Sequence, residues 1–105
     1  MPVNTFLGRQ ITVDAEGFLS IPDQWDESLA SHLATYAGIS ELSDEQWAVI
    51  RFAHDDARQT GQSPTLRRLH DVGGFDIKRL FELFPGKPAK KIAYIAGFPK
   101  PAACV

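Results

Sequence analysis

Signals that begin and end helices divide this chain into short segments, and they constrain its fold more than any other feature. After Pro22, a capping residue or a proline precedes most segments, and a glycine or a proline follows them. The pattern predicts five helices, at residues 23–36, 43–60, 64–72, 76–84 and 88–96. A chain of 105 residues is only marginally able to bury its surface, so these helices should pack simply and closely.

Apolar residues at helical spacing predict which faces are buried. They are Trp25, Leu29, Leu33 and Tyr36 in the first segment, Trp47, Ile50, Ala53 or His54, and Ala57 in the second, Leu66 and Leu69 in the third, and Ile77, Leu80, Phe81 and Phe84 in the fourth. Ser43 and Gln46 have the spacing of a capping box. Ser63 is expected to cap the third helix with Pro64 at its first position, and Gly97 to end the fifth.

The residues before Pro22 predict strands instead. Residues 5–7 and 10–13 are short strand-like runs with a turn expected at Gly8-Arg9, and residues 14–17 form a second turn signal before Phe18. The expected fold is therefore mainly α, a small orthogonal bundle of about five helices with an N-terminal β-hairpin. We expect a single domain over residues 1–105, with no internal repeat and no linker.

Charge is distributed unevenly along the chain, although the net charge is only −2. Residues 1–63 contain three Lys or Arg and ten Asp or Glu, whereas residues 64–105 contain eight and three. The basic half favours an acidic protein partner or a nucleic acid. Alternatively, the two halves neutralise each other across the fold.

Several classes of function are disfavoured by what the sequence lacks. It has no apolar run long enough for a membrane span and no signal-peptide pattern, so we expect a cytoplasmic protein without membrane contact. The histidines at 32, 54 and 70 are not spaced as metal ligands, so we expect packing or surface roles for them and no metal. A glycine-rich phosphate loop is also missing, and we expect no cofactor.

Two short helices around a turn, with Arg67 and Arg68 on the second, are typical of a helix-turn-helix. Two arginines are far fewer than the roughly 6–10 phosphate contacts of a tight DNA-binding protein. Direct nucleic-acid binding is therefore a minor alternative, and Arg67 is retained as a candidate partner-binding residue.

The single cysteine, Cys104, is the second-to-last residue of the chain. Pro99 and Pro101 exclude a helix or a central strand there, so residues 97–105 are expected to form an extended, mobile arm. Seven residue steps separate Gly97 from Cys104 and can span roughly 25 Å. A lone cysteine is usually a small buried hydrophobe, but this position predicts a working thiol that enters another protein.

Basic residues surround this thiol in the sequence. Lys90, Lys91 and Lys100 favour the thiolate, whereas the carboxylate of Val105 opposes it. We expect the three lysines to dock a partner or to stabilise a sulfur adduct. For each of them, plain solvated surface is the alternative.

A family resemblance is concentrated in the same C-terminal region. The residues that carry it are 83–91 (LFPGKPAKK), 95–101 (IAGFPKP) and Cys104-Val105, with upstream support from Gly17-Phe18-Leu19, 45–52 (EQWAVIRF) and Ser63-Pro64 before Leu66-Arg67. With these residues the chain resembles the DsrC/TusE family of small sulfur-relay proteins and partners of dissimilatory sulfite reductase. The resemblance covers most of the chain.

The resemblance implies a helical domain with a hairpin, in which Cys104 carries sulfane sulfur as a persulfide. Family members divide on a second cysteine, whose position here is Ala93. Members with one cysteine resemble the relay protein that passes sulfur toward 2-thiouridine of tRNA. Its partners would be an upstream sulfurtransferase like TusBCD or DsrEFH and a downstream acceptor protein.

Such a chain acts with partner enzymes more than as an autonomous enzyme, since no general base is visible in the sequence. The alternative is a DsrC-like partner or regulatory protein in sulfur oxidation or sulfite reductase metabolism, with or without DNA binding. In that case the arm would plug a partner without carrying sulfur.

Overall fold

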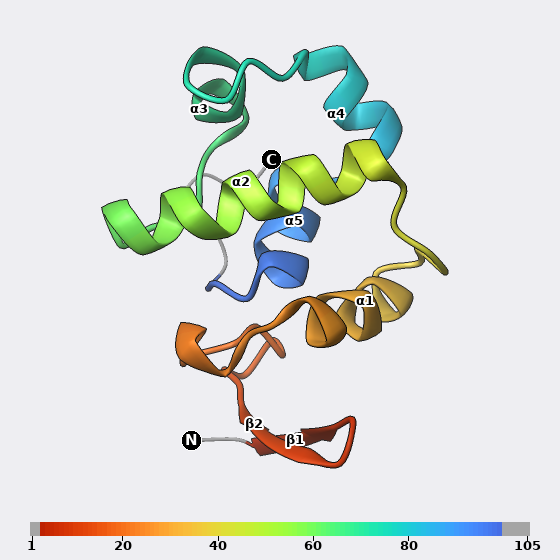
Figure 1. Cartoon of the computed structure of the whole chain (residues 1–105), viewed down its shortest axis with the longest axis vertical. Coiled ribbons are helices and arrows are strands. Elements are labelled where there is room, and N and C mark those ends of the chain that lie inside the picture. Colours follow the sequence, from red (N-terminus) through yellow and green to blue (C-terminus); the bar gives the residue numbers. More distant parts are fainter. Residues whose placement is uncertain (1–2, 100–105) are drawn as a thin grey trace.

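The computed structural model describes residues 3–99, which form five α-helices and one two-stranded antiparallel hairpin (Figure 1). The elements are β1 (Val3–Phe6), β2 (Arg9–Thr12), a 3-10 turn (Pro22–Gln24), α1 (Glu27–Tyr36), α2 (Asp44–Thr60), α3 (Leu66–Asp71), α4 (Ile77–Leu83) and α5 (Pro88–Ala96). This confirms the predicted mainly α fold. Within residues 3–99, no helix is both long and apolar enough to cross a bilayer.

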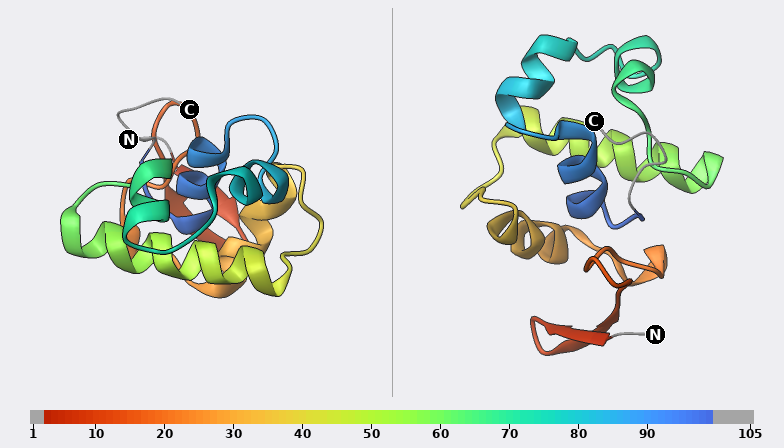
Figure 2. Two further views of the ribbon diagram at one scale, coloured as in Figure 1. Left: turned by 90° about the horizontal axis from the view of Figure 1, so that it is seen from above. Right: turned by 180° about the vertical axis from the view of Figure 1, so that it is seen from behind.

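Helix α5 lies at the centre of the molecule. It passes between α1 on one side and α2 on the other, while α3 and α4 lie at the top of the view in Figure 1, where α4 also contacts α5, and the hairpin packs beyond α1 (Figures 1 and 2). Ile92 and Ile95 of α5 are completely buried. Because both long neighbours bury their apolar stripes against α5, little of this helix reaches solvent.

The hairpin turn lies one residue earlier than predicted. Leu7 and Gly8 form it, with φ angles of 52° and 75°, and Phe6 pairs with Arg9. Positive φ at both central residues is the geometry of the tight turn that matches strand twist. In this register Phe6 and Ile11 share one face and pack against Leu29 and Leu33 of α1.

The first helix begins later than the sequence pattern indicated. Asp26 is its N-cap, three residues after the predicted start at Asp23, and its Oδ1 accepts a hydrogen bond from the backbone N–H of Leu29 at 2.8 Å. Trp25 therefore lies outside the helix in an extended conformation. Tyr36 was expected on the buried face, but it is 63% exposed, because its ring contacts Phe6 and His32 at one edge and most of it faces away from the core.

The third helix was also misplaced at its start. Thr65 is the N-cap, and its hydroxyl accepts a hydrogen bond from the backbone N–H of Arg68. The prediction of Ser63 as the N-cap and Pro64 as the first helical residue was therefore wrong. In α4, Leu80 is buried as expected, whereas Ile77 and Phe81 are 36% and 45% exposed. Their stripe is amphipathic, but no neighbouring element covers it fully.

The signals of α2 and α5 are confirmed. Ser43 and Gln46 form both hydrogen bonds of a capping box. Gly61 and Gly97 end the two helices in the left-handed conformation, both with φ of 82°.

Candidate functional site

Cys104 and Lys100 lie outside the described residues, and so does most of the expected arm. The structure does describe the point where this arm begins, which we call the arm root and define as Gly97, Phe98 and Pro99. Its geometry decides where the remaining residues of the arm start.

The end of α5, just before the arm root, is closed by hydrogen bonds. The last four carbonyls of a helix have no partner within the helix, and they need other donors when they are buried. Here the donors are the N–H of Phe98 to Ala93 O (3.1 Å), the N–H of Gly97 to Tyr94 O (3.4 Å), Trp25 Nε1 to Ile95 O (2.8 Å) and His54 Nδ1 to Ala96 O (2.7 Å). All four carbonyls are thus satisfied, two of them by aromatic side chains from elsewhere in the chain.

These aromatic donors form a stack beneath the arm root. The rings of Trp25 and His54 are 3.9 Å apart and nearly parallel, and the ring of Phe98 lies 5.3 Å from His54. His54 is buried, and because a carbonyl can only accept, its Nδ1 must carry a proton. Phe98 is 5% exposed, so the first side chain of the arm root belongs to the core.

Gly97 lets the chain pass Trp25 at very short range. A Cβ atom at this position would lie 2.7 Å from Trp25 Cγ and 2.9 Å from Trp25 Cβ, both of which are fixed close to the backbone. Only glycine fits this approach and the left-handed φ together.

Beyond this point, Pro99 is tied to the start of the α3 segment. Ser63 Oγ donates to the carbonyl of Pro99 at 2.8 Å, which is the role that Ser63 has in place of helix capping. A cavity of about 430 Å³ opens beside the arm root, and Asp23 and Arg58, which line it, pair at 2.8 Å. The arm root is therefore held by residues of α2, α5 and two loops.

The predicted partner-binding residues that the structure describes lie apart from the arm root. Lys90 and Lys91 are half-buried near the start of α5, six or more residues before Gly97, which is about 9 Å along a helix. Lys90 Nζ is 3.9 Å from a carboxylate oxygen of Glu16. Arg67 lies on α3 with its side chain 89% exposed and pairs with Asp71 at 3.5 Å. The structure thus groups the two lysines but not Arg67.

Arg68, the second arginine of the helix-turn-helix pattern, forms an ion pair within the protein. Both Arg68 nitrogens that face Asp56 are 2.7 Å from its carboxylate, which is buried. This hydrogen bond raises the pKa of Arg68 further above its ordinary value. Arg68 therefore binds the α2 surface and is not directed outward as the sequence pattern indicated.

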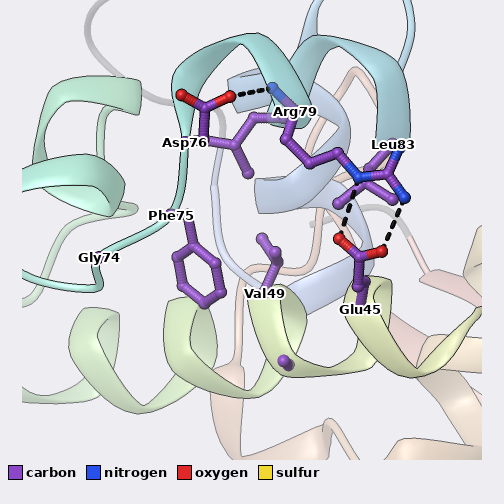
Figure 3. A pocket seen from close by; sticks show the side chains of 9 residues that line it. Glu45, Val49, Gly74, Phe75, Asp76, Arg79 and Leu83 are labelled. Carbon is purple, nitrogen blue, oxygen red and sulfur yellow. Dashed lines mark hydrogen bonds and ion pairs between the residues drawn. The ribbon is translucent and has the colours of Figure 1, made fainter.

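A cavity of about 270 Å³ between α2 and α4 carries a similar pair (Figure 3). Arg79 hydrogen-bonds Glu45 through two nitrogens at 2.6 and 3.0 Å, and this lowers the pKa of the Glu45 carboxyl. Val49 and Phe75 contribute apolar lining. Each charged side chain of the cavity already has a partner, since Glu45 pairs with Arg79 and Asp76 accepts from the backbone N–H of Arg79 as the cap of α4, so these groups serve to join the two helices.

Two further observations bear on the chemistry of the arm. Residues 3–99 contain no group of His, Cys, Asp or Glu side chains that could hold a metal ion. Ala93 is buried in α5, and its carbonyl accepts from Phe98.

Trp25 and His54, which fix the arm root, were not identified as site residues from the sequence, because their partners are 70 and 42 residues away.

Comparison with known proteins gives a consistent result. Residues 5–105 match the family model described as DsrC like protein. The chain is 40% identical over 109 residues to "Sulfurtransferase TusE" of Shigella dysenteriae, covering 95% of this chain and 97% of that protein. It is 36% identical to "Sulfite reductase, dissimilatory-type subunit gamma" of Nitratidesulfovibrio vulgaris, covering 96% of both. A chain in the crystal structure of dissimilatory sulfite reductase I (DsrI) superposes with a TM-score of 0.83 at 34% identity, covering 99% of this chain and 100% of that one.

Proposed function

This chain belongs to the DsrC-like family, and from that premise we propose that it is a sulfur carrier in which Cys104 holds the transferred sulfur as a persulfide. The observation that carries the proposal is the family match, which runs to residue 105 and so includes the single thiol. The similarity to a protein named sulfurtransferase supports sulfur transfer as the reaction.

Each transfer is a thiol exchange that needs no added oxidant. The Cys104 thiol loses its proton, and the thiolate attacks the sulfane sulfur of a donor persulfide. The new bond joins Cys104 Sγ to that sulfur, the donor S–S bond breaks, and the donor leaves as a thiolate. A thiolate of the acceptor then attacks the outer sulfur of Cys104 in the same way, and Cys104 is regenerated.

A single cysteine makes this carrier dependent on its partners. The chain cannot form an internal disulfide, because Ala93 stands at the position of the second family cysteine. We therefore propose an upstream sulfurtransferase of the TusBCD or DsrEFH kind, a downstream acceptor protein, and the cytoplasm, whose reducing environment keeps a free thiol available. More specifically, we propose that the sulfur is passed on toward 2-thiouridine of tRNA.

The arm root supports delivery of Cys104 into such a partner. Its hydrogen bonds and buried Phe98 fix the place where the arm begins. Five residue steps from Pro99 to Cys104 can then span at most about 17 Å. Fixing one end of the arm reduces the number of conformations that are lost on insertion.

The test is intact-mass spectrometry of the full-length reduced protein after incubation with inorganic polysulfide. We expect one added sulfur atom, which dithiothreitol removes and which Cys104→Ser does not acquire. An unmodified wild-type protein, or an adduct that persists in Cys104→Ser, would contradict the proposal.

The tRNA branch needs its own measurement. We expect 2-thiouridine in total tRNA to fall in cells that lack this protein and to return with the wild-type gene but not with Cys104→Ser. Unchanged 2-thiouridine would refute this branch and favour the second candidate, a partner of sulfite reductase. The similarity to a sulfite reductase gamma subunit supports that candidate.

A further inference from the structure

A cavity of about 330 Å³ opens along the solvent-facing side of α5, from Lys87 just before the helix to Tyr94 in its last turn. Its lining comes from the segment after β2, the end of α1 and this side of α5, and consists of Phe18, Tyr36, Ala37, Lys87, Lys90, Lys91 and Tyr94. We call it the lysine–tyrosine pocket. Lys90, Lys91 and Tyr94 are the half-exposed residues of α5, so this pocket contains the part of the central helix that faces solvent.

The polar groups of the pocket all suit an anionic ligand. They are three lysine ammonium groups and two tyrosine hydroxyls, and no carboxylate lines the cavity. Glu16 at the rim lies 3.9 Å from Lys90, and the first turn of α5 contains no acidic residue. Glu16 therefore offsets the charge of Lys90, whereas Lys87 and Lys91 form no ion pair within residues 3–99, and the pocket combines hydrogen-bond donors with a net positive charge.

The remaining lining is apolar and aromatic. Phe18 and Tyr94 meet edge to face at 5.5 Å, and Ala37 closes one side. Burial raises the pKa of Tyr94, as does nearby Tyr36, so its hydroxyl stays protonated and able to donate. Tyr36 leaves an aromatic ring mostly exposed at the rim, where it can cover an inserted side chain.

We propose that the lysine–tyrosine pocket binds an acidic peptide segment of a partner protein, with one aromatic or large aliphatic side chain in the cavity and its neighbouring carboxylates on the lysines. A segment of this kind satisfies both the apolar walls and the cationic rim. The volume suits one such side chain, and charge complementarity fixes its flanking residues.

The charges favour this occupant over two others. A nucleic acid would gain only three lysines here, far fewer than the roughly 6–10 phosphate contacts of a tight nucleic-acid-binding protein. Residues 100–105 of this chain contain no acidic and no aromatic side chain, and Lys100 offsets the carboxylate of Val105, so this segment lacks both the net negative charge and the large side chain that the pocket requires.

The pocket also bears on sulfur transfer, a step that rests on the proposed function. The arm root is about 9 Å along α5 from Lys91, and the arm adds up to about 17 Å of reach. A partner held by the pocket would therefore need its own reactive sulfur within these distances of the bound segment. The lysines would act by positioning the partner and not by contact with the sulfur.

The direct test is a titration of ¹⁵N-labelled full-length protein with the acetylated peptide Glu-Asp-Phe-Asp-Glu, followed by amide chemical shifts. We expect shifts at Tyr36, Ala37 and Tyr94 that saturate. The peptide with alanine in place of phenylalanine should bind about tenfold more weakly, because it buries no ring. An absence of shifts at these residues, or equal binding of the alanine peptide, would overturn the proposal.

Charge variants locate the site. Lys87→Glu/Lys91→Glu should weaken the Glu-Asp-Phe-Asp-Glu peptide by about tenfold, since two attractions become repulsions. Arg67→Glu/Lys78→Glu is the matched control, because it makes the same change in net charge at exposed residues of α3 and α4 that do not line the pocket, and its affinity should be unchanged. Equal weakening by the control would overturn the proposal, as would tighter binding of an oligouridylate of equal charge.

The outcome can be separated from that of the carrier proposal. Cys104→Ser should bind the peptide as the wild type does, and Lys87→Glu/Lys91→Glu should still acquire one sulfur atom from inorganic polysulfide. If wild-type protein binds the peptide but takes up no sulfur, the carrier proposal fails and the pocket stands. If sulfur is acquired and no peptide binds, the pocket proposal alone is refuted.

Discussion

Replacing Gly97 with alanine should destabilise the protein much more than an ordinary glycine-to-alanine change at a helix end. The added Cβ would sit 2.7 Å from Trp25 Cγ, in a backbone conformation with φ of 82°. The indole cannot easily move away, because its Nε1 donates to Ile95 O and its ring stacks on His54. The substitution therefore combines backbone strain with overpacking.

The size of the effect follows from these two parts. Left-handed backbone costs a non-glycine residue about 1–2 kcal/mol. Overpacking a filled site costs about 1–3 kcal/mol more. Gly97→Ala should thus lower the free energy of unfolding by about 2–5 kcal/mol, which for a domain of this size corresponds to a fall in Tm of roughly 10–30 °C.

Gly61→Ala is a closely matched control. Gly61 ends α2 with the same φ of 82°, but a Cβ there would meet no atom within 4 Å. Gly61→Ala should therefore lower the free energy of unfolding only by the cost of the left-handed backbone, about 1–2 kcal/mol. Urea unfolding of both variants, with equal m-values, gives the difference that is due to Trp25.

Repeating the Gly97→Ala substitution in a Trp25→Ala background tests whether the Trp25 ring causes the extra destabilisation. With Trp25→Ala present, Gly97→Ala should cost no more than Gly61→Ala, because the obstructing ring is gone. If Gly97→Ala and Gly61→Ala differ by less than about 0.5 kcal/mol in the wild-type background, the close approach has no energetic weight and the reasoning is wrong.

The other predictions concern hydrogen bonds and pH. His54→Phe should cost about 1–3 kcal/mol in urea unfolding by leaving the Ala96 carbonyl without a donor, and a loss no larger than that of His54→Asn, which keeps a donor, would contradict this. Ser43→Ala should cost about 1 kcal/mol by removing half of the capping box, with Ser43→Asp as the retained-cap control. The pKa values of Glu27 and Glu45 are lowered from 4.5, mainly by hydrogen bonds from their arginine partners. Their contribution to stability is therefore complete above about pH 4.5 and is lost as the pH falls through the lower pKa values of the folded state. In Glu27→Gln/Glu45→Gln, Tm should decline less steeply below pH 4.5 than in the wild type. An unchanged slope of Tm against pH would refute this prediction.

Local signals were sufficient to predict the elements that depend on neighbouring residues. The Ser43–Gln46 box and the glycines at 61 and 97 are confirmed because each acts within one turn of its own helix. Where two capping residues stand close together, the sequence pattern does not decide between them. Asp26 caps α1 although Asp23 was expected within that helix, and Thr65 caps α3 in place of Ser63.

The candidate site was predictable only in part, for a different reason. Cys104 can be identified from its position and from the family resemblance alone. The stack of Trp25, His54 and Phe98 cannot, because it depends on contacts between distant segments that no local spacing encodes. Similarly, the exposure of Phe81 depends on whether another element covers α4, which its amphipathic pattern does not reveal.

The two aromatic donors at the end of α5 also affect the order of folding. Trp25 and His54 reach carbonyls 70 and 42 residues later in the chain, so these bonds require α1, α2 and α5 to be assembled first. Contacts of such long sequence separation are expected to form late. An intermediate that has its helices but not these two bonds leaves two carbonyls at the end of α5 without donors and does not fix the arm root. The position of the arm root is thus a property that the protein acquires only with its last tertiary contacts.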